Sequence, residues 1–159
     1  MRILFCLLIL TTCSVAEDWP QYLGPGRDAV WREKNVELDF AKRSPRLLWA
    51  VPTGGGYAGP SVAEGRVFVV DRLAEPYVAG KLKPGRNVNF VRARIPGKER
   101  VRCLKESNGE VLWEHAYAAD YSSVYPYAIG PRTTPLVYEG VVYTLGAAGP
   151  LRAYTAKEG

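Results

Sequence analysis

Two stretches of this chain share one pattern, and that pattern predicts the fold. Pro60–Phe68 reads PSVAEGRVF, and Pro135–Tyr143 reads PLVYEGVVY, 75 residues further along. Along the chain the apolar pattern has a period of two, and in both stretches it breaks at a Glu-Gly pair. A period of two predicts short β-strands, and a glycine accepts the positive φ that a tight reversal requires. The sequence therefore contains a repeated β-hairpin.

A second pair of segments extends this repeat. Val101–Gly109 reads VRCLKESNG, and Leu151–Gly159 reads LRAYTAKEG, 50 residues later. A Leu-Trp pair also occurs twice, ending at Trp49 and at Trp113. Each unit then consists of three strands, a turn and a fourth strand that carries tryptophan, which is typical of a propeller blade. The predicted fold class is all-β, with four-stranded antiparallel blades in an incomplete β-propeller of about two blades.

The apolar pattern gives the strand positions, and no segment shows a sustained helical period. The predicted strands are Arg46–Val51, Ser61–Ala63, Arg66–Val70, Arg100–Lys105, Glu110–His115, Thr134–Tyr138, Val141–Leu145 and Leu151–Thr155. The first is an isolated fourth strand, and the last unit lacks one. We therefore expect the N-terminal part of a longer propeller. The alternative is a head-to-tail ring of identical chains, which self-associate through their open blade edges.

The N-terminus predicts export. Arg2 precedes an apolar run, Ile3–Leu10, and small residues follow as far as Ala16. This run is too short to cross about 30 Å of hydrocarbon but fits the core of a signal peptide. We expect residues 1–16 to be removed and the protein to be periplasmic or extracellular. An alternative is a lipid anchor at Cys13, and no other stretch predicts a transmembrane span.

Composition predicts a folded remainder. The chain is 47% hydrophobic and 23% charged, which excludes a disordered or collagen-like protein. Residues 17–45 form an N-terminal extension, and residues 46–159 form the repeats. Cys103 is the one cysteine beyond the leader, so it cannot form an internal disulfide, and its place in an alternating run predicts a small buried residue.

Two long connections interrupt the repeat. About 25 extra residues surround Arg72 to Lys98, and nine basic but only two acidic residues fall between Arg72 and Arg102. This segment is a solvated loop or a site for anionic polysaccharide or lipid headgroups. Its few aromatic residues argue against nucleic acid. The second connection contains tyrosines 117, 121, 125 and 127, followed by Arg132, and forms a partner site or packs against the first connection.

The residues do not assemble a catalytic centre. His115 is the only histidine, and with one cysteine it makes neither a Ser-His-Asp triad nor a zinc site. Gly54–Gly56 lacks the Lys-Ser/Thr pair and the helix of a phosphate loop, so it predicts a flexible connecting turn. The prediction names no catalytic residue and no metal ligand, and cofactor-binding residues are unknown.

The sequence of the repeat resembles that of the PQQ-like β-propeller proteins, which are named after the pyrroloquinoline-quinone dehydrogenases. The segment Asp18–Asp28, DWPQYLGPGRD, is similar to the opening of exported bacterial members. The resemblance implies that Trp49 and Trp113 dock between neighbouring blades. The quinone dehydrogenases also use an Asp base, a calcium ion held by carboxylate and amide oxygens, and often a disulfide between adjacent cysteines, none of which can be matched here.

These observations predict a non-catalytic binding or scaffold module that is exported. Its expected partners are a protein, a glycan or a component of the cell envelope, and no cofactor is evident. The alternative is a fragment of a quinone-dependent dehydrogenase, with pyrroloquinoline quinone and calcium bound through residues in further blades.

Overall fold

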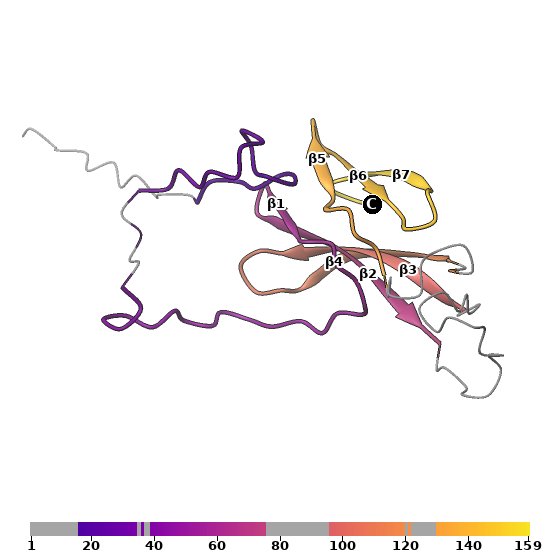
Figure 1. Ribbon diagram of the computed structural model, residues 1–159, viewed down its shortest axis with the longest axis horizontal. Helices are drawn as coiled ribbons and strands as arrows, with labels where there is room; N and C mark the ends of the chain where they lie inside the picture. Colours follow the sequence, from indigo (N-terminus) through magenta and orange to yellow (C-terminus); the bar gives the residue numbers. More distant parts are fainter. Residues whose placement is uncertain (1–15, 35, 37–38, 76–95, 120, 122–129) are drawn as a thin grey trace, which may run out of the picture.

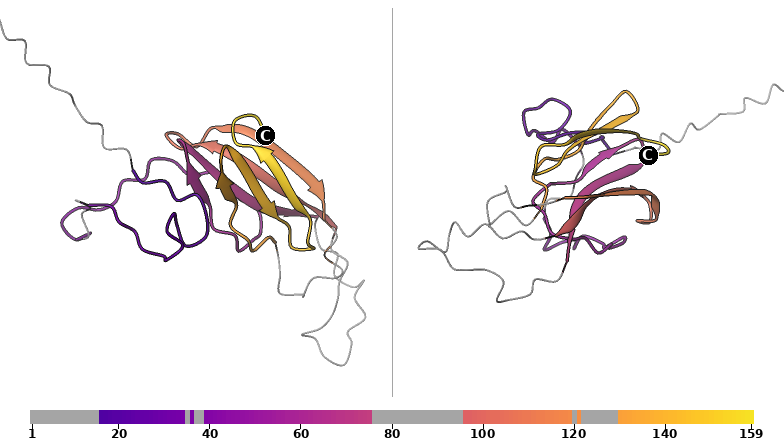
Figure 2. Two further views of the ribbon diagram at one scale, coloured as in Figure 1. Left: turned by 90° about the horizontal axis from the view of Figure 1, so that it is seen from above. Right: turned by 90° about the vertical axis from the view of Figure 1, so that its right-hand side faces the viewer.

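The computed structural model describes residues 16–34, 36, 39–75, 96–119, 121 and 130–159. These residues form two antiparallel β-sheets and no helix, so the protein is all-β, as predicted. Sheet A has the strand order β1 (Ser61–Ala63), β2 (Arg66–Ala74), β3 (Gly97–Lys105) and β4 (Val111–Ala118). Sheet B has the order β5 (Leu136–Tyr138), β6 (Val141–Leu145) and β7 (Leu151–Thr155). The two sheets stack as layers (Figures 1 and 2).

The first hairpin of each sheet has the same geometry. Ser61 faces Phe68 in sheet A, and Leu136 faces Tyr143 in sheet B, at positions 75 residues apart. Both Glu-Gly turns have positive φ at both central residues, 52° and 70° in the first turn and 48° and 73° in the second. This is the conformation of a type I′ turn, whose twist matches that of the flanking strands. The repeat seen in the sequence is therefore also a repeat of backbone structure.

The predicted strands match closely, with one clear error. β1, β6 and β7 have the predicted bounds, and β2 and β3 extend further into the long connection, to Ala74 and from Gly97. The rest of that connection, 76–95, lies outside the described residues. The predicted strand Arg46–Val51 is wrong, because these residues belong to neither sheet. A strand needs a neighbour to bond with, and among the described residues none pairs with this segment.

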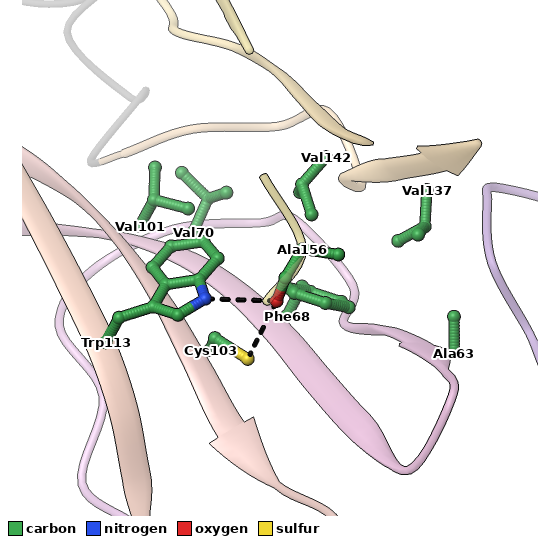
Figure 3. Close-up of a cluster of buried hydrophobic side chains, with 9 residues drawn as sticks. All are labelled: Ala63, Phe68, Val70, Val101, Cys103, Trp113, Val137, Val142 and Ala156. Atoms are coloured by element: carbon green, nitrogen blue, oxygen red, sulfur yellow. Dashed lines mark hydrogen bonds between the residues drawn. The ribbon is translucent and has the colours of Figure 1, made fainter. Parts of the chain in front are cut away.

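The core lies between the two sheets. We call the side of sheet A that faces sheet B its front face, and the side of sheet B that faces sheet A its back face. The core cluster combines Ala63, Phe68, Val70, Val101, Cys103 and Trp113 of the front face of sheet A with Val137, Val142 and Ala156 of sheet B. Figure 3 shows the Trp113 ring lying among these side chains. The alternation along each strand therefore sets a front and a back for each sheet.

Two tryptophans make the same hydrogen bond at matching places. The indole N–H of Trp113 donates to the backbone oxygen of Ala156 at 3.1 Å, and that of Trp49 donates to the backbone oxygen of Glu106 at 2.6 Å. Glu106 and Ala156 are 50 residues apart, the offset of the second repeated pair. Trp113 thus joins sheet A to sheet B. The segment before β1, drawn in purple in Figure 1, runs along the back face of sheet A, the side away from sheet B, and its Trp49 bonds to the turn that follows β3.

The N-terminal extension is part of this architecture. Trp19 and Val62 exchange two backbone hydrogen bonds of 2.8 and 2.9 Å, and the amide of Val137 donates to the oxygen of Pro20 at 2.8 Å. Val62 and Val137 occupy matching positions, 75 residues apart. One short segment therefore ties together the first strands of both sheets.

Candidate interaction surface

The front face of sheet B is an exposed apolar surface. The apolar side chains that point away from sheet A are exposed at Tyr138, Leu145, Leu151 and Ala153 and half-buried at Leu136, Val141 and Tyr143, and Thr155 adds one hydroxyl to this face. Leu145 is 40% exposed, Tyr138 60% and Leu151 72%. Apolar side chains gathered on one face, rather than scattered singly, mark a site of interaction. We therefore take this face as the candidate functional site.

A hollow of about 610 Å³ lies at one end of the front face. Leu136, Tyr138 and Tyr143 form one wall, and the N-terminal turn forms the other, with Gln21 and Arg27. The Arg27 Nε donates to the Gln21 side-chain oxygen at 2.9 Å. Arg27 itself has a φ of 54°, a left-handed conformation that is uncommon outside glycine. The turn thus places two polar groups beside an apolar wall.

The outer edge of β7 adds backbone bonding capacity to this surface. β7 is the last strand of sheet B, and among the described residues none pairs with its outer edge. An open edge presents unpaired N–H and C=O groups, which form a template for another strand. The front face and the β7 edge are adjacent, so a partner could use both.

The tyrosine-rich connection is partly buried between the sheets. The hydroxyls of Tyr117 and Tyr121 donate to the two carboxylate oxygens of Glu99, at 2.5 and 2.6 Å, and the Ala147 amide donates to the same carboxylate at 2.9 Å. Burial, followed by the hydrogen bond with Glu99 and its charge, raises the pKa of both tyrosines. The hydroxyls of Tyr117 and Tyr121 are thus used in hydrogen bonds within the protein. Tyr125 and Tyr127 lie outside the described residues.

Two arginines complete this cluster. The Arg72 guanidinium lies 3.9 Å from the centroid of the Tyr121 ring, and that of Arg152 lies 3.8 Å from the centroid of the Tyr117 ring. Arg152 comes from β7, and Tyr117 from β4, so the contact crosses between the sheets. The cluster closes the end of the sheet interface that lies beyond the apolar core.

A second polar cluster covers the back face of sheet A. Asp71 accepts two hydrogen bonds from Arg100, at 2.9 and 2.6 Å, one from Arg102 at 3.2 Å and one from the Gly54 amide at 2.6 Å. Gly55 pairs with Arg72 as an antiparallel bridge. The amides of Gly54 and Gly55 are thus bonded to β2, which holds this part of the predicted turn against sheet A. Arg100 and Arg102, from the basic stretch, are paired rather than solvated.

The single histidine and the cysteine of the repeats both have packing roles. The His115 ring stacks on Tyr154, with centroids 5.0 Å apart, and lies 5.7 Å from the Trp113 ring. Cys103 is fully buried, and this burial raises the pKa of its thiol to about 11. A buried thiol with a raised pKa holds little thiolate, so Cys103 lacks the properties of a nucleophile.

The two buried carboxylates of the described residues have no oxygen left free for a calcium ion. Asp71 and Glu99 are both buried, and all four of their oxygens accept hydrogen bonds from arginine, tyrosine or backbone donors. Within the described ranges, no group of three His, Cys, Asp or Glu side chains is placed to hold a metal ion. The same ranges contain no helix of the length and apolarity that a membrane span needs.

Comparison with known proteins does not identify a family for this chain. No protein-family model matches it, and no curated protein matches its sequence.

Proposed function

We propose that this protein is an exported, non-catalytic binding or scaffold module of the PQQ-like repeat type, and that it engages its partner through the front face of sheet B and the β7 edge. The matching hydrogen bonds of Trp49 and Trp113 are the observation that carries this proposal. They support a blade-like repeat, in which a tryptophan from one sheet docks on the third strand of the next. A binding role follows because the module leaves a bare apolar face.

The proposal also draws on how the polar residues are used. The two buried carboxylates of the described residues, Asp71 and Glu99, are both engaged by hydrogen-bond donors from this chain. The exposed part of sheet B is apolar, which suits association rather than acid–base chemistry. Adding pyrroloquinoline quinone and calcium, with an alcohol and a redox dye, tests the non-catalytic part. Dye reduction above the background of heat-denatured protein would contradict it.

Thiol labelling in living cells tests both export and binding. The chain is produced with its own leader in a Gram-negative host, as Tyr22→Cys or Leu151→Cys, and treated with a maleimide that crosses only the outer membrane. Tyr22 and Leu151 have nearly the same exposure, 71% and 72%. We expect rapid labelling at position 22 and slow labelling at position 151 in cells, but equal labelling in dilute purified protein.

The outcomes of this experiment separate the two parts. Failure to label position 22 in intact cells would contradict export. Equal labelling of both positions in cells would contradict a partner on the front face. The unaltered chain gives the background, since its Cys103 is buried.

A further inference from the structure

We propose that the partner on the front face of sheet B is a second copy of this chain, joined head to tail, whose residues 46–51 add to the β7 edge as a fourth strand. This inference rests on the proposed function, because it names the occupant of the same surface. It is argued from how sheet A and sheet B are related within one chain.

The two front faces correspond position by position. Phe68 and Val70 on β2 match Tyr143 and Leu145 on β6 at the 75-residue offset. Val101 and Cys103 on β3 match Leu151 and Ala153 on β7 at the 50-residue offset. In sheet A these positions are at most 3% exposed, because sheet B covers them. In sheet B, Tyr143 is half-buried, but Leu145, Leu151 and Ala153 are exposed, so a surface like the back face of another sheet would fit against them.

The back face of sheet A already holds the fourth strand of such a neighbour. A Cβ added to Gly109 would lie 2.7 Å from the Trp49 ring and 3.1 Å from Val51. A Cβ added to Gly159 would lie 3.2 Å from Trp113 and 2.4 Å from His115. His115 follows Trp113 by two residues, as Val51 follows Trp49. Residues 46–51 therefore occupy, on sheet A, the place that β4 occupies on sheet B.

Among the described residues, no strand pairs with residues 46–51, and none pairs with the outer edge of β7. Leu47 and Leu48 are 79% and 64% exposed, and no described residue pairs with their backbone. Sheet B of a second copy supplies three strands with an open edge of the matching type. A single docking step, which repeats the relation of sheet A to sheet B, then pairs this edge and covers the bare face.

This geometry also specifies the register and the symmetry. In sheet A, Arg102 faces Glu114. The matching positions are Arg152 on β7 and Ala50 of the second copy, so these two residues are expected to face one another. The contact is heterologous, and repetition closes a ring when the rotation allows it. Since propellers have about four to eight blades, a ring of two-sheet chains would contain about two to four copies.

Disulfide cross-linking tests the register. In the full chain, Cys6 and Cys13 are replaced by serine and Cys103 by alanine, the residue that stands at the matching position, 153. Ala50→Cys and Arg152→Cys are then combined. We expect mild oxidation to shift this variant to cross-linked dimers and higher multiples on a non-reducing gel. The matched control combines Ala50→Cys with Tyr138→Cys, which lies on β5, the opposite edge strand of sheet B. This control is expected to associate but to run as an uncross-linked single chain on the same gel.

Two results would overturn the inference: equal cross-linking of the test pair and the control, or a single-chain mass for the unaltered protein at micromolar concentration by light scattering. A single-chain mass together with slow labelling of Leu151→Cys in cells would leave the proposed function standing and assign the face to another partner. Rapid labelling at that position in cells, with no cross-link, would contradict both proposals.

Discussion

Trp113 is the residue whose hydrogen bond most directly joins the two sheets. Its ring is 8% exposed, and its indole N–H satisfies the buried oxygen of Ala156. We expect Trp113→Phe to lower the free energy of unfolding by about 1 to 3 kcal/mol, because the buried Ala156 oxygen loses the indole donor and keeps only the weak Cys103 thiol, 3.9 Å away. Urea unfolding measures this loss. Trp49→Phe is the matched control and should lower the free energy of unfolding by less, because water can reach the exposed Glu106 when the indole donor is removed. An equal loss in both variants would contradict this account.

The buried hydroxyl of Tyr121 should make the folded protein less stable at high pH. Burial, with the hydrogen bond from Tyr121 to Glu99, raises the pKa of this tyrosine above 10.0. The folded state therefore keeps the proton at a pH where the unfolded chain releases it. This contribution to stability is complete below about pH 10 and is lost as the pH rises further. Tyr121→Phe should flatten the decline in denaturation midpoint above pH 10, whereas Tyr22→Phe, at an exposed site, should not.

At the scale of elements, Asp71 on β2 holds both β3 and the segment around Gly54. Burial alone would raise the pKa of Asp71, but the hydrogen bonds from Arg100 and Gly54 hold it below its usual range. The resulting stability is present above about pH 4 and is lost as the pH falls. Asp71→Asn should lower the free energy of unfolding by about 3 kcal/mol at pH 7, because two arginines lose their counter-charge. The substitution should also remove the loss of stability that Asp71 causes as the pH falls.

Urea unfolding of Asp71→Asn at pH 7 and at pH 4 provides the measurement, and hydrogen exchange at residues 52–56 reports the loosened segment. Asp28→Asn is the control, because Asp28 forms an exposed pair with Arg32, four residues further along the chain. An exposed pair contributes little, so its removal should leave stability nearly unchanged. An Asp71→Asn profile parallel to that of the unaltered chain would contradict the assigned role.

The N-terminal segment depends on Gly24. This glycine has a φ of 77°, and a Cβ there would lie 2.7 Å from the Trp19 ring. Gly24→Ala should displace Trp19 and release the segment from β1 and β5, which limited proteolysis within residues 16–34 would detect. Gly65→Ala is the control, since Gly65 has a φ of 70° but nothing within 4 Å of the added atom. Similar cleavage in both variants would mean that the strained backbone conformation, and not contact with the Trp19 ring, releases the segment.

Local elements could be predicted from the sequence, and contacts between distant polar residues could not. Val141–Leu145 was predicted to the residue because a hairpin depends on neighbouring residues and a Glu-Gly turn. Arg46–Val51 was mispredicted because a strand depends on a partner elsewhere. Glu99 appeared to be an ordinary charge in a basic run. Its one signal was its spacing, two residues before Val101 on the same face of β3, which predicts burial.

At the scale of the whole molecule, the two sheets stack in one orientation, with the front face of sheet A packed on the back face of sheet B. Leu145 and Leu151 stand where the buried Val70 and Val101 stand in sheet A. The double variant Leu145→Lys, Leu151→Lys should change the single chain's free energy of unfolding by less than about 1 kcal/mol, since both sites are exposed. The same charges at Val70 and Val101 should unfold it. Association adds stability by mass action, so the melting temperature of the unaltered chain should rise with protein concentration, whereas that of the Leu145/Leu151 variant should not. A concentration-independent melting temperature in both would mean that the front face meets no second copy, and its apolar residues would need another partner.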